Sequence, residues 1–247
     1  MFDRYREQLK QYCIEQYPKE AIVAIFDYGL EYIENTHDDP ENNFRIAPEK
    51  FIELEEKDVK AILHSHPDGF LYPTKSDMIS QISCGIPFGI IVTDGKDATR
   101  PVWWGDQIER APLIGRGFIY GIYDCYSCCR DYYHHAGLDL PEFPRDWDWW
   151  HNDENMYIDN FTKAGFHEIE GVDVKEGDAL LFAIKSDVPN HAAVYLGDNM
   201  MLHHLGSQSP VDLSRLSRRE PVTRWVKHVK HWLRNDEYKA ENFSYTW

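Results

Sequence analysis

Three residues in the second half of the sequence have the types expected of a nucleophilic thiol and its base. Cys125 opens the segment DCYSCCRDYYHHAG, and His191 and His203 lie in two successive short apolar segments. A thiol becomes nucleophilic when a histidine takes its proton, and that histidine needs a third polar group to orient its ring. We therefore expect Cys125 to be the nucleophile, His191 its base and His203 the residue that orients His191.

The first half contains a different set, suited to binding a metal ion. His64 and His66 lie two apart in AILHSHP, so on an extended segment both imidazoles point to one face and can share a metal. Asp77 follows at the start of the next predicted element. Two histidines and one carboxylate leave the fourth position of Zn²⁺ for water, as in hydrolytic sites. The sequence thus predicts a zinc site, although other first-row metal ions accept the same ligands.

A hydrolytic zinc site also needs a general base, which the His-x-His motif does not supply. Glu20 stands at the start of the apolar segment KEAIVAIF. From a neighbouring strand it can accept the proton of a zinc-bound water. We expect Glu20 to be this base.

The cysteine set requires a helix followed by a sheet. The segment 124–137 predicts a helix of about three turns, with Cys125 at its N-terminus. Because a helix N-terminus carries partial positive charge, we expect it to lower the pKa of the Cys125 thiol. Three short apolar segments at 177–184, 191–197 and 199–205, separated by turn residues, predict an antiparallel meander. A helix followed by a sheet is an α+β arrangement.

The metal set requires mixed α and β elements. Apolar spacing predicts a helix within 5–18, and apolar, β-branched segments predict strands at 21–30, 59–67 and 87–95. The segment 76–85 predicts a short helix that begins at a serine and ends at a glycine. The predicted strand 59–67 runs into a loop at its two histidines.

The chain is long enough for two domains, and a segment rich in turn-forming residues indicates where they meet. The segment RAPLIGRGFIYG is rich in glycine and ends the first pattern of elements. We therefore predict domains at residues 1–108 and 112–247. The apolar content, 43%, supplies enough side chains for two cores, so the chain is expected to fold rather than to be disordered.

Charge and cysteine content exclude several classes of function. The net charge of −16 disfavours binding to nucleic acid or to anionic membranes, because both require a basic face. Five cysteines, three of them in one short segment, do not form a disulfide framework. The polar N-terminal segment predicts no signal peptide, and no apolar run is long enough to predict a membrane span. We expect a chain that is made in the cytoplasm.

Three other residues near the cysteine set have simpler interpretations. Cys128 and Cys129 are most simply buried small hydrophobic side chains, although Cys125 and Cys128 form a Cys-x-x-Cys pair that a redox or half-zinc site also uses. Strand alternation turns His204 to the face opposite His203, where packing or solvent contact is expected.

The cysteine set resembles the NlpC-type peptidases. YDCYSCCRDYY is similar to their nucleophile helix, and GDALLFAI with NHAAVYLGDNMMLHH is similar to their two histidine strands, so the resemblance covers roughly residues 112–234. It implies a papain-like α+β fold and a cysteine endopeptidase acting on the peptide stems of bacterial peptidoglycan. Cys128 departs from the family pattern, where a small or aliphatic residue is more usual.

The metal set resembles the JAMM (MPN) metalloprotease motif, over roughly residues 3–98. His64, His66, Pro67 and Asp77 match that motif, which is preceded by a distant glutamate, here Glu20. Thr74 occupies the position of the family's serine, and its hydroxyl can donate a hydrogen bond to a developing oxyanion. The resemblance implies a zinc metallopeptidase site, with Thr74 among its catalytic residues.

A JAMM-like domain followed by an NlpC-type domain resembles the tail tip assembly proteins of lambda-like phages. The resemblance implies a protein of the virion tail tip, assembled in the host cytoplasm, with other tail tip proteins and peptidoglycan peptides as its partners. It also accounts for the lack of a predicted signal peptide. The alternative is a structural tail component whose two enzyme folds serve as docking surfaces.

Overall fold

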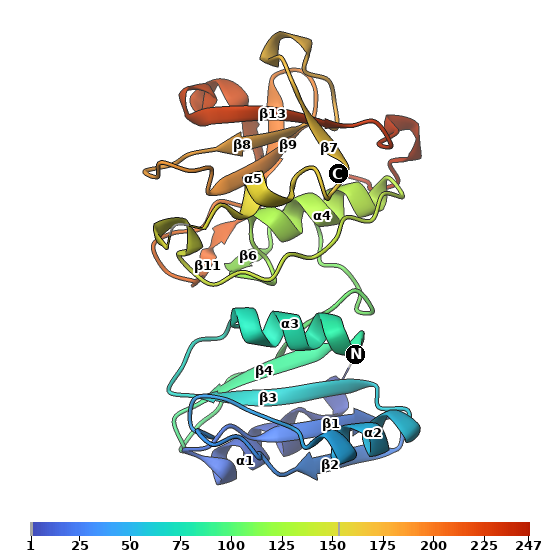
Figure 1. Cartoon of the computed structure of the whole chain (residues 1–247), viewed down its shortest axis with the longest axis vertical. Helices are drawn as coiled ribbons and strands as arrows, with labels where there is room; N and C mark the ends of the chain where they lie inside the picture. The colour runs from blue at the N-terminus through green and yellow to red at the C-terminus, as the bar shows by residue number, and fades with distance from the viewer. Residues whose placement is uncertain (1, 153) are drawn as a thin grey trace. The chain divides into compact units, whose positions relative to one another are not determined.

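The computed structural model describes residues 2–152 and 154–247, and it shows a mixed α/β protein (Figure 1). The chain divides into two compact units. The first contains the residues up to Pro73 together with Asp77–Glu109, and the second contains Thr74–Ser76 and Arg110–Trp247. The main change from one unit to the other therefore falls in the gap between the two predicted domains. The short segment Thr74–Ser76 lies within the predicted first domain but groups with the second unit.

The first unit is built on one sheet with the strand order β2-β1-β3-β4-β5. Its strands are β1 (Ile22–Phe26), β2 (Gly29–Ile33), β3 (Ala61–Pro67), β4 (Phe88–Thr93) and β5 (Val102–Trp104). The strands β3 and β4 are parallel and the other pairs are antiparallel. The predicted strand over 21–30 is instead a hairpin, because β1 turns back into β2 after Phe26. Neither β5 nor α2, described next, was predicted.

Three helices accompany this sheet: α1 (Arg6–Gln16), α2 (Pro48–Glu56) and α3 (Lys75–Cys84). The helix α3 is the crossover that joins β3 to β4, as a parallel pair requires. Figure 1 shows α3 beside these two strands. A crossover helix returns over the sheet, so its first turn lies near the end of the strand that precedes it. This geometry brings Asp77 back towards the histidines of β3.

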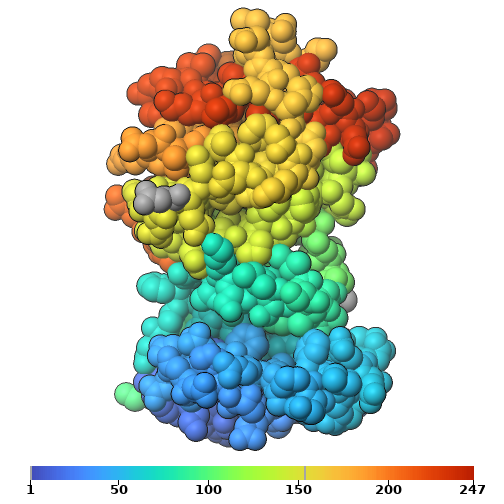
Figure 2. All heavy atoms as spheres, in the orientation of Figure 1, coloured from blue at the N-terminus to red at the C-terminus, as the bar shows by residue number. Residues whose placement is uncertain are grey.

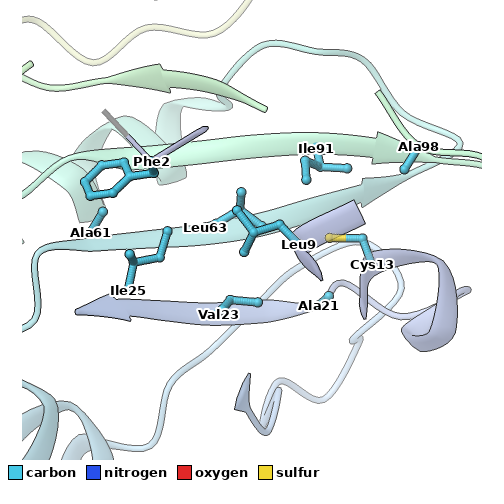
Figure 3. Close-up of a cluster of buried hydrophobic side chains, with 10 residues drawn as sticks. All are labelled: Phe2, Leu9, Cys13, Ala21, Val23, Ile25, Ala61, Leu63, Ile91 and Ala98. Carbon is cyan, nitrogen blue, oxygen red and sulfur yellow. The ribbon is translucent and has the colours of Figure 1, made fainter. Parts of the chain in front are cut away.

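The apolar core lies on one face of the sheet, and the two histidines of β3 lie on the other face. Leu9 and Cys13 of α1 pack against Val23, Leu63 and Ile91 of three neighbouring strands (Figure 3). Side chains alternate along a strand, so the neighbours of Leu63 in β3 point to the opposite face. The two imidazoles of β3 therefore face away from α1.

The second unit is built on an antiparallel sheet with the order β12-β10-β9-β8-β13-β7. Its strands are β7 (Phe166–Ile169), β8 (Ala179–Phe182), β9 (His191–Tyr195), β10 (Met200–His203), β12 (Arg218–Pro221) and β13 (Val229–Asn235). The strands β6 (Gly117–Ile119) and β11 (Val211–Leu216) form a separate ribbon. The predicted meander corresponds to β8, β9 and β10, and the structure confirms it.

One face of this sheet is covered by α4 (Cys125–His135), and α5 (Met156–Asn160) lies beside that helix (Figure 1). Tyr126 and Tyr133 of α4 line the same small apolar cavity as Leu181, Ala192 and Leu233 of the sheet. The predicted helix over 124–137 is confirmed. Short 3-10 turns occupy Asp3–Tyr5, Trp149–His151, Gly171–Asp173, Val222–Arg224, Val226–His228 and Ala240–Asn242.

The last residues of the chain pack against α4. Tyr132 of α4 contacts the rings of Tyr238, Phe243 and Trp247, and the backbone N–H of Ser244 donates a hydrogen bond of 2.9 Å to a carbonyl at the end of the helix. Figure 2 shows this red segment at the surface of the second unit, next to the yellow-green residues that end α4.

None of the helices described, over residues 2–152 and 154–247, is both long enough and apolar enough to cross a membrane.

Candidate functional site

The start of α4 is fixed by a capping box. The Asp124 carboxylate accepts a hydrogen bond of 2.9 Å from the backbone N–H of Ser127, and the Ser127 hydroxyl accepts one of 2.8 Å from the backbone N–H of Asp124. Reciprocal bonds of this kind satisfy two of the free donors at a helix N-terminus. They fix Cys125 as the first residue of the helix.

Asp124 is buried, and its charge is balanced by a buried arginine. Arg145 Nη2 lies 2.7 Å from Asp124 Oδ2, and that oxygen also accepts the backbone N–H of Gly121 at 2.9 Å. Burial alone would raise the pKa of Asp124, but Arg145 and the two backbone donors hold it below its ordinary value. The loop before α4 is thereby attached to the segment that follows the helix.

The thiol of Cys125 has two polar neighbours that the sequence did not identify. Its Sγ lies 3.1 Å from the Tyr157 hydroxyl of α5, and it accepts a backbone hydrogen bond from Ala192 in β9. Burial, together with the charge on Asp124, raises the pKa of Cys125 to about 11. The expectation that the helix N-terminus lowers this pKa is therefore wrong, because desolvation of the thiolate and a neighbouring carboxylate outweigh the helix dipole.

The two predicted histidines meet across neighbouring strands. His191 Nε2 and His203 Nδ1 are hydrogen-bonded at 3.1 Å. Since His203 is directly opposite Ala193 in the register of β9 and β10, His191 is its diagonal neighbour on the same face. Burial lowers the pKa of His191 well below its ordinary value, and the nearby imidazole of His203 adds to this. Burial also lowers the pKa of His203, to about 4.

A buried glutamate extends this pair. His203 Nε2 lies 2.9 Å from Oε1 of Glu220 in β12, and the same oxygen accepts the indole N–H of Trp225 at 2.5 Å. No local pattern singles out Glu220, since it lies in the charged segment RREP. Tyr157 and Arg145 were missed as well, because their partners are distant in the chain.

Cys125 and His191 line the same groove in the second unit. The groove has a volume of about 920 Å³, and its walls include Trp147 and Trp150 on one segment and Lys185 on another. The structure therefore brings the proposed nucleophile and base to one surface that is open to a ligand. The volume is sufficient for a peptide segment rather than for a single amino acid.

The two other cysteines of α4 and His204 are packing residues. Cys128 is buried beside Arg116, whose guanidinium opposes the rise that burial causes in the pKa of this thiol. Cys129 is also buried, and the ring of His204 is held by a contact of 2.9 Å to the carbonyl of Arg215. These positions agree with the simpler interpretation of all three residues.

In the first unit, the three predicted metal ligands converge. His64 Nε2 and His66 Nε2 are 3.0 Å apart, and they lie 3.6 and 3.5 Å from the two carboxylate oxygens of Asp77. All three side chains are buried or nearly so. Burial alone would raise the pKa of Asp77, but the two imidazoles hold it well below its ordinary value.

These distances fit a tetrahedral metal ion. With zinc–ligand bonds of about 2.0–2.1 Å, the ligand atoms of a tetrahedral site lie roughly 3.3 Å apart. The Nδ1 of His66 contacts the carbonyl of Phe70 at 2.9 Å, which leaves Nε2 with its lone pair towards the other two ligands. Among the described residues His64 Nδ1 has no hydrogen-bond partner, and the ring of Phe44 stacks on His64 at 4.5 Å.

The structure places Glu20 near the metal ligands. It is buried just before β1, and burial raises its pKa to about 8 while the charges on His66 and Asp77 act on it in opposite directions. Its carboxyl group therefore lies within electrostatic reach of both residues. Thr74 is exposed and immediately precedes α3. Its predicted role as an oxyanion donor stays a prediction.

The sequence of the chain is similar to two phage proteins. Tail tip assembly protein K of Escherichia phage lambda is 33% identical over 201 residues, which are 81% of this chain and 94% of that protein. Tail tip assembly protein K of Escherichia phage N15 is 30% identical over 207 residues, which are 81% of this chain and 83% of that protein.

The chain also matches a family and a solved structure. The crystal structure of the NlpC/p60 domain of the peptidoglycan hydrolase SagA is 17% identical, with a TM-score of 0.32, and the match covers 49% of this chain and 89% of that one. The sequence model of the NlpC/P60 family matches residues 102–230, which is just over half of the chain. The chain belongs to the NlpC/P60 family.

Proposed function

We propose that the second unit is a cysteine endopeptidase that cuts peptide bonds in the stem or crossbridge peptides of peptidoglycan. The observation that supports this most directly is the groove that Cys125 and His191 share, with His203 hydrogen-bonded behind His191. Membership of the NlpC/P60 family supports the same class of enzyme. In this proposal Cys125 is the nucleophile, His191 the general base and His203 the residue that orients it.

The electrostatics of the site define the order of the proton transfers. Since the pKa of Cys125 is raised and that of His191 is lowered, the resting pair is a neutral thiol and a neutral imidazole. Attack on the scissile carbonyl carbon moves the thiol proton to His191 as the C–S bond forms. The imidazolium then gives that proton to the departing amine as the C–N bond breaks. A water molecule, deprotonated by His191, hydrolyses the thioester and frees Cys125.

We also propose that the protein acts in the tail tip of a phage virion. The support is its similarity to two proteins named tail tip assembly protein K, over most of this chain and most of theirs. Its partners there are other tail tip proteins, and its substrate is the cell wall that the tail meets. Assembly in the host cytoplasm is consistent with this location.

For the first unit we propose a Zn²⁺ site held by His64, His66 and Asp77, with a hydrolytic role. The convergence of the three ligand atoms supports it, and so does the resemblance of His64, His66 and Asp77 to the JAMM motif. Bound zinc polarises a water molecule and a substrate carbonyl. Glu20 would hold the proton taken from that water, and Thr74 would donate a hydrogen bond to the oxyanion.

Release of new amino groups from purified peptidoglycan tests the cysteine peptidase. We expect the wild-type protein to release them and Cys125→Ala to lose activity by several orders of magnitude, because no other group replaces the nucleophile. The control is Cys129→Ala, which removes a buried thiol from the same helix and should keep most of the activity. A double variant, His64→Ala with His66→Ala, shows which part of the activity depends on the first unit.

The outcomes separate the proposed function from its alternative. Activity lost with Cys125 and kept in the double variant supports a cysteine peptidase in the second unit. A folded wild-type protein that releases no amino groups, alone or in assembled tails, would contradict the proposal. That result would favour a structural tail component instead.

A further inference from the structure

Three ionisable side chains lie in one row across three neighbouring strands of the second unit. His191 in β9 is the diagonal neighbour of His203 in β10, on one face of the sheet. Glu220 in β12 is directly opposite Met201, so it is in turn the diagonal neighbour of His203 on that face. The contacts between the side chains follow the row, with 3.1 Å between the imidazoles and 2.9 Å from His203 to Glu220.

The carboxylate at the end of the row determines where the protons lie. An ionised carboxylate only accepts hydrogen bonds. At 2.9 Å a bare lone pair on His203 Nε2 would face the charge of Glu220, so this nitrogen carries the proton. A neutral imidazole has one N–H, which leaves His203 Nδ1 as an acceptor. His191 Nε2 must then donate to it, and the proton-free nitrogen of His191 is Nδ1.

We propose that Glu220 is a positioning residue that sets the tautomers of both histidines and so leaves Nδ1 of His191 free to take the thiol proton. The inference rests on the proposed function of the second unit and adds a fourth member to its Cys-His-His set. With Glu220 absent, His203 can hold its proton on Nδ1 and donate it to His191 Nε2. The proton of His191 then moves to Nδ1, and the imidazole is no longer a base towards Cys125.

The surroundings of Glu220 keep it ionised and in place. The indole N–H of Trp225 donates to Oε1 at 2.5 Å, and Arg218 and Arg224 lie 3.4 Å from its two oxygens. Burial alone would raise its pKa, but His203 and these donors lower it. The other charged or titratable groups that act on His203 are Arg218 and His204.

The contact between His203 and Glu220 is close but not linear. Within the described part of the chain, His203 Nε2 makes no hydrogen bond of good angle. The inference therefore depends on the distance and on the sign of the charge, and not on the direction of the N–H bond. At 2.9 Å the negative charge of Glu220 favours a protonated Nε2 over a bare lone pair even when the N–H bond is not aligned with the carboxylate oxygen.

The first test needs no variant and no activity. Nitrogen NMR of protein labelled with ¹⁵N in histidine distinguishes protonated from proton-free ring nitrogens. For wild type at neutral pH we expect proton-free Nδ1 and protonated Nε2 on both His191 and His203, assigned with His191→Gln and His203→Gln variants. A protonated Nδ1 on His191 would overturn the inference even if the protein cuts peptidoglycan. The NMR measurement does not depend on cleavage. It therefore distinguishes failure of this inference from failure of the proposed peptidase function.

The second test removes the charge of Glu220 and keeps its shape. In Glu220→Gln the amide accepts or donates, so it no longer selects one tautomer of His203. We expect kcat to fall on the order of 10–100-fold with little change in KM, by analogy with the loss of a carboxylate that supports a metal-bound histidine. We also expect the ¹⁵N spectrum to show a mixture of tautomers and the acid limb of the pH profile of kcat to shift.

The chain offers a matched control. Glu168 contacts His231 Nδ1 at 2.9 Å on β7 and β13 of the same sheet, outside the row. Glu168→Gln removes a carboxylate from a histidine in the same way and should leave kcat, the pH profile and the tautomers of the row unchanged. A Glu220→Gln variant that matches this control in all three measurements would contradict the inference.

Discussion

The two units use the same residue types in two different geometries. In the first unit two imidazoles and a carboxylate converge, with ligand atoms 3.0–3.6 Å apart around one point. In the second unit two imidazoles and a carboxylate form a line, in which each group contacts only the next. A converging set has the geometry of a cation site, whereas a line of groups can fix the tautomers of its imidazoles.

The difference arises from where the histidines lie on their sheets. His64 and His66 are two apart in one strand, so their side chains are parallel and reach the same point. His191 and His203 lie on adjacent antiparallel strands as diagonal neighbours, so one ring lies behind the other. Histidine content alone therefore does not predict whether two imidazoles converge or line up, whereas their placement on the strands does.

A second difference is in how charge is compensated. The second unit carries its own counterion for the carboxylate that precedes Cys125, in the buried pair of Asp124 and Arg145. In the first unit Asp77 faces two histidines, and burial lowers the pKa of His64. Stability of the second unit should thus depend on its own side chains, and stability of the first on an added cation.

The largest expected effect comes from removing the internal counterion. Arg145→Met leaves Asp124 buried without its partner, which should destabilise the second unit by about 3–5 kcal/mol. Urea unfolding followed by tryptophan fluorescence measures this. The double variant Arg145→Met with Asp124→Asn removes both charges and keeps a good N-cap residue, so it should lose less.

The control for this variant is an exposed arginine. Arg215→Met removes a half-exposed side chain that lies 3.8 Å from Asp212, and we expect a change within about 0.5 kcal/mol. Equal losses in Arg145→Met and Arg215→Met would mean that the buried pair has no special role. Zinc should not restore the stability of Arg145→Met.

An intermediate effect is expected from zinc on the first unit. A ligand that binds only the folded state stabilises it by about 2.7 kcal/mol when the free ligand is about 100 times its Kd. Differential scanning calorimetry of metal-free protein with added Zn²⁺ should show a higher Tm. Replacing His64 and His66 by alanine should abolish the shift, and Cys125→Ala should keep it.

The metal content of the same variants sharpens the comparison. One zinc per chain in both wild type and Cys125→Ala, with none in the His64 and His66 double variant, would assign the ion to the converging set. Loss of zinc in Cys125→Ala would contradict the separation of the two sites. A Tm that does not respond to zinc in any protein would contradict the metal centre itself.

The smallest effect is expected at the thiol. Tyr157→Phe removes the hydroxyl 3.1 Å from Cys125 Sγ, which lowers the pKa of this thiol by stabilising the thiolate. The variant should therefore have a pKa above the wild-type value of about 11 and a cleavage rate roughly 2–10-fold lower, the size of one neutral hydrogen bond. The rate of alkylation by iodoacetamide as a function of pH measures the shift.

A tyrosine on the nucleophile helix is the control for this change. The Tyr126 hydroxyl donates to the carbonyl of Pro141 at 2.6 Å rather than to the sulfur. Tyr126→Phe should leave the alkylation profile of Cys125 unchanged. If both variants shift the profile equally, the effect comes from packing of the aromatic rings and not from a hydrogen bond to sulfur.

Local patterns were enough to predict the elements that carry the site residues. Cys125 begins a helix because an aspartate cap precedes it, and His64 and His66 share a face because they alternate along one strand. The proximity of His191 and His203 could also be predicted from the sequence, since a short turn joins β9 and β10 and sets their register. Each of these predictions depends on residues that are close in the sequence.

What the sequence did not predict depends on contacts between distant segments. Glu220 joins the row only because β12 pairs with β10, and no local signal sets that pairing. Tyr157 reaches α4 from the short helix α5, and Arg145 reaches it from a segment outside the helices and strands. The raised pKa of Cys125 follows from the same contacts, because the degree of burial is a property of the whole fold.

The protonated resting state of Cys125 has a consequence for the durability of the protein. Oxidants and alkylating agents attack the thiolate much faster than the thiol. Because burial and the charge on Asp124 raise the pKa of Cys125, we expect its thiol to stay protonated at neutral pH and to react slowly with peroxide in the absence of substrate. The Cys125 thiol should therefore resist oxidation during long storage, because its thiolate forms only during turnover.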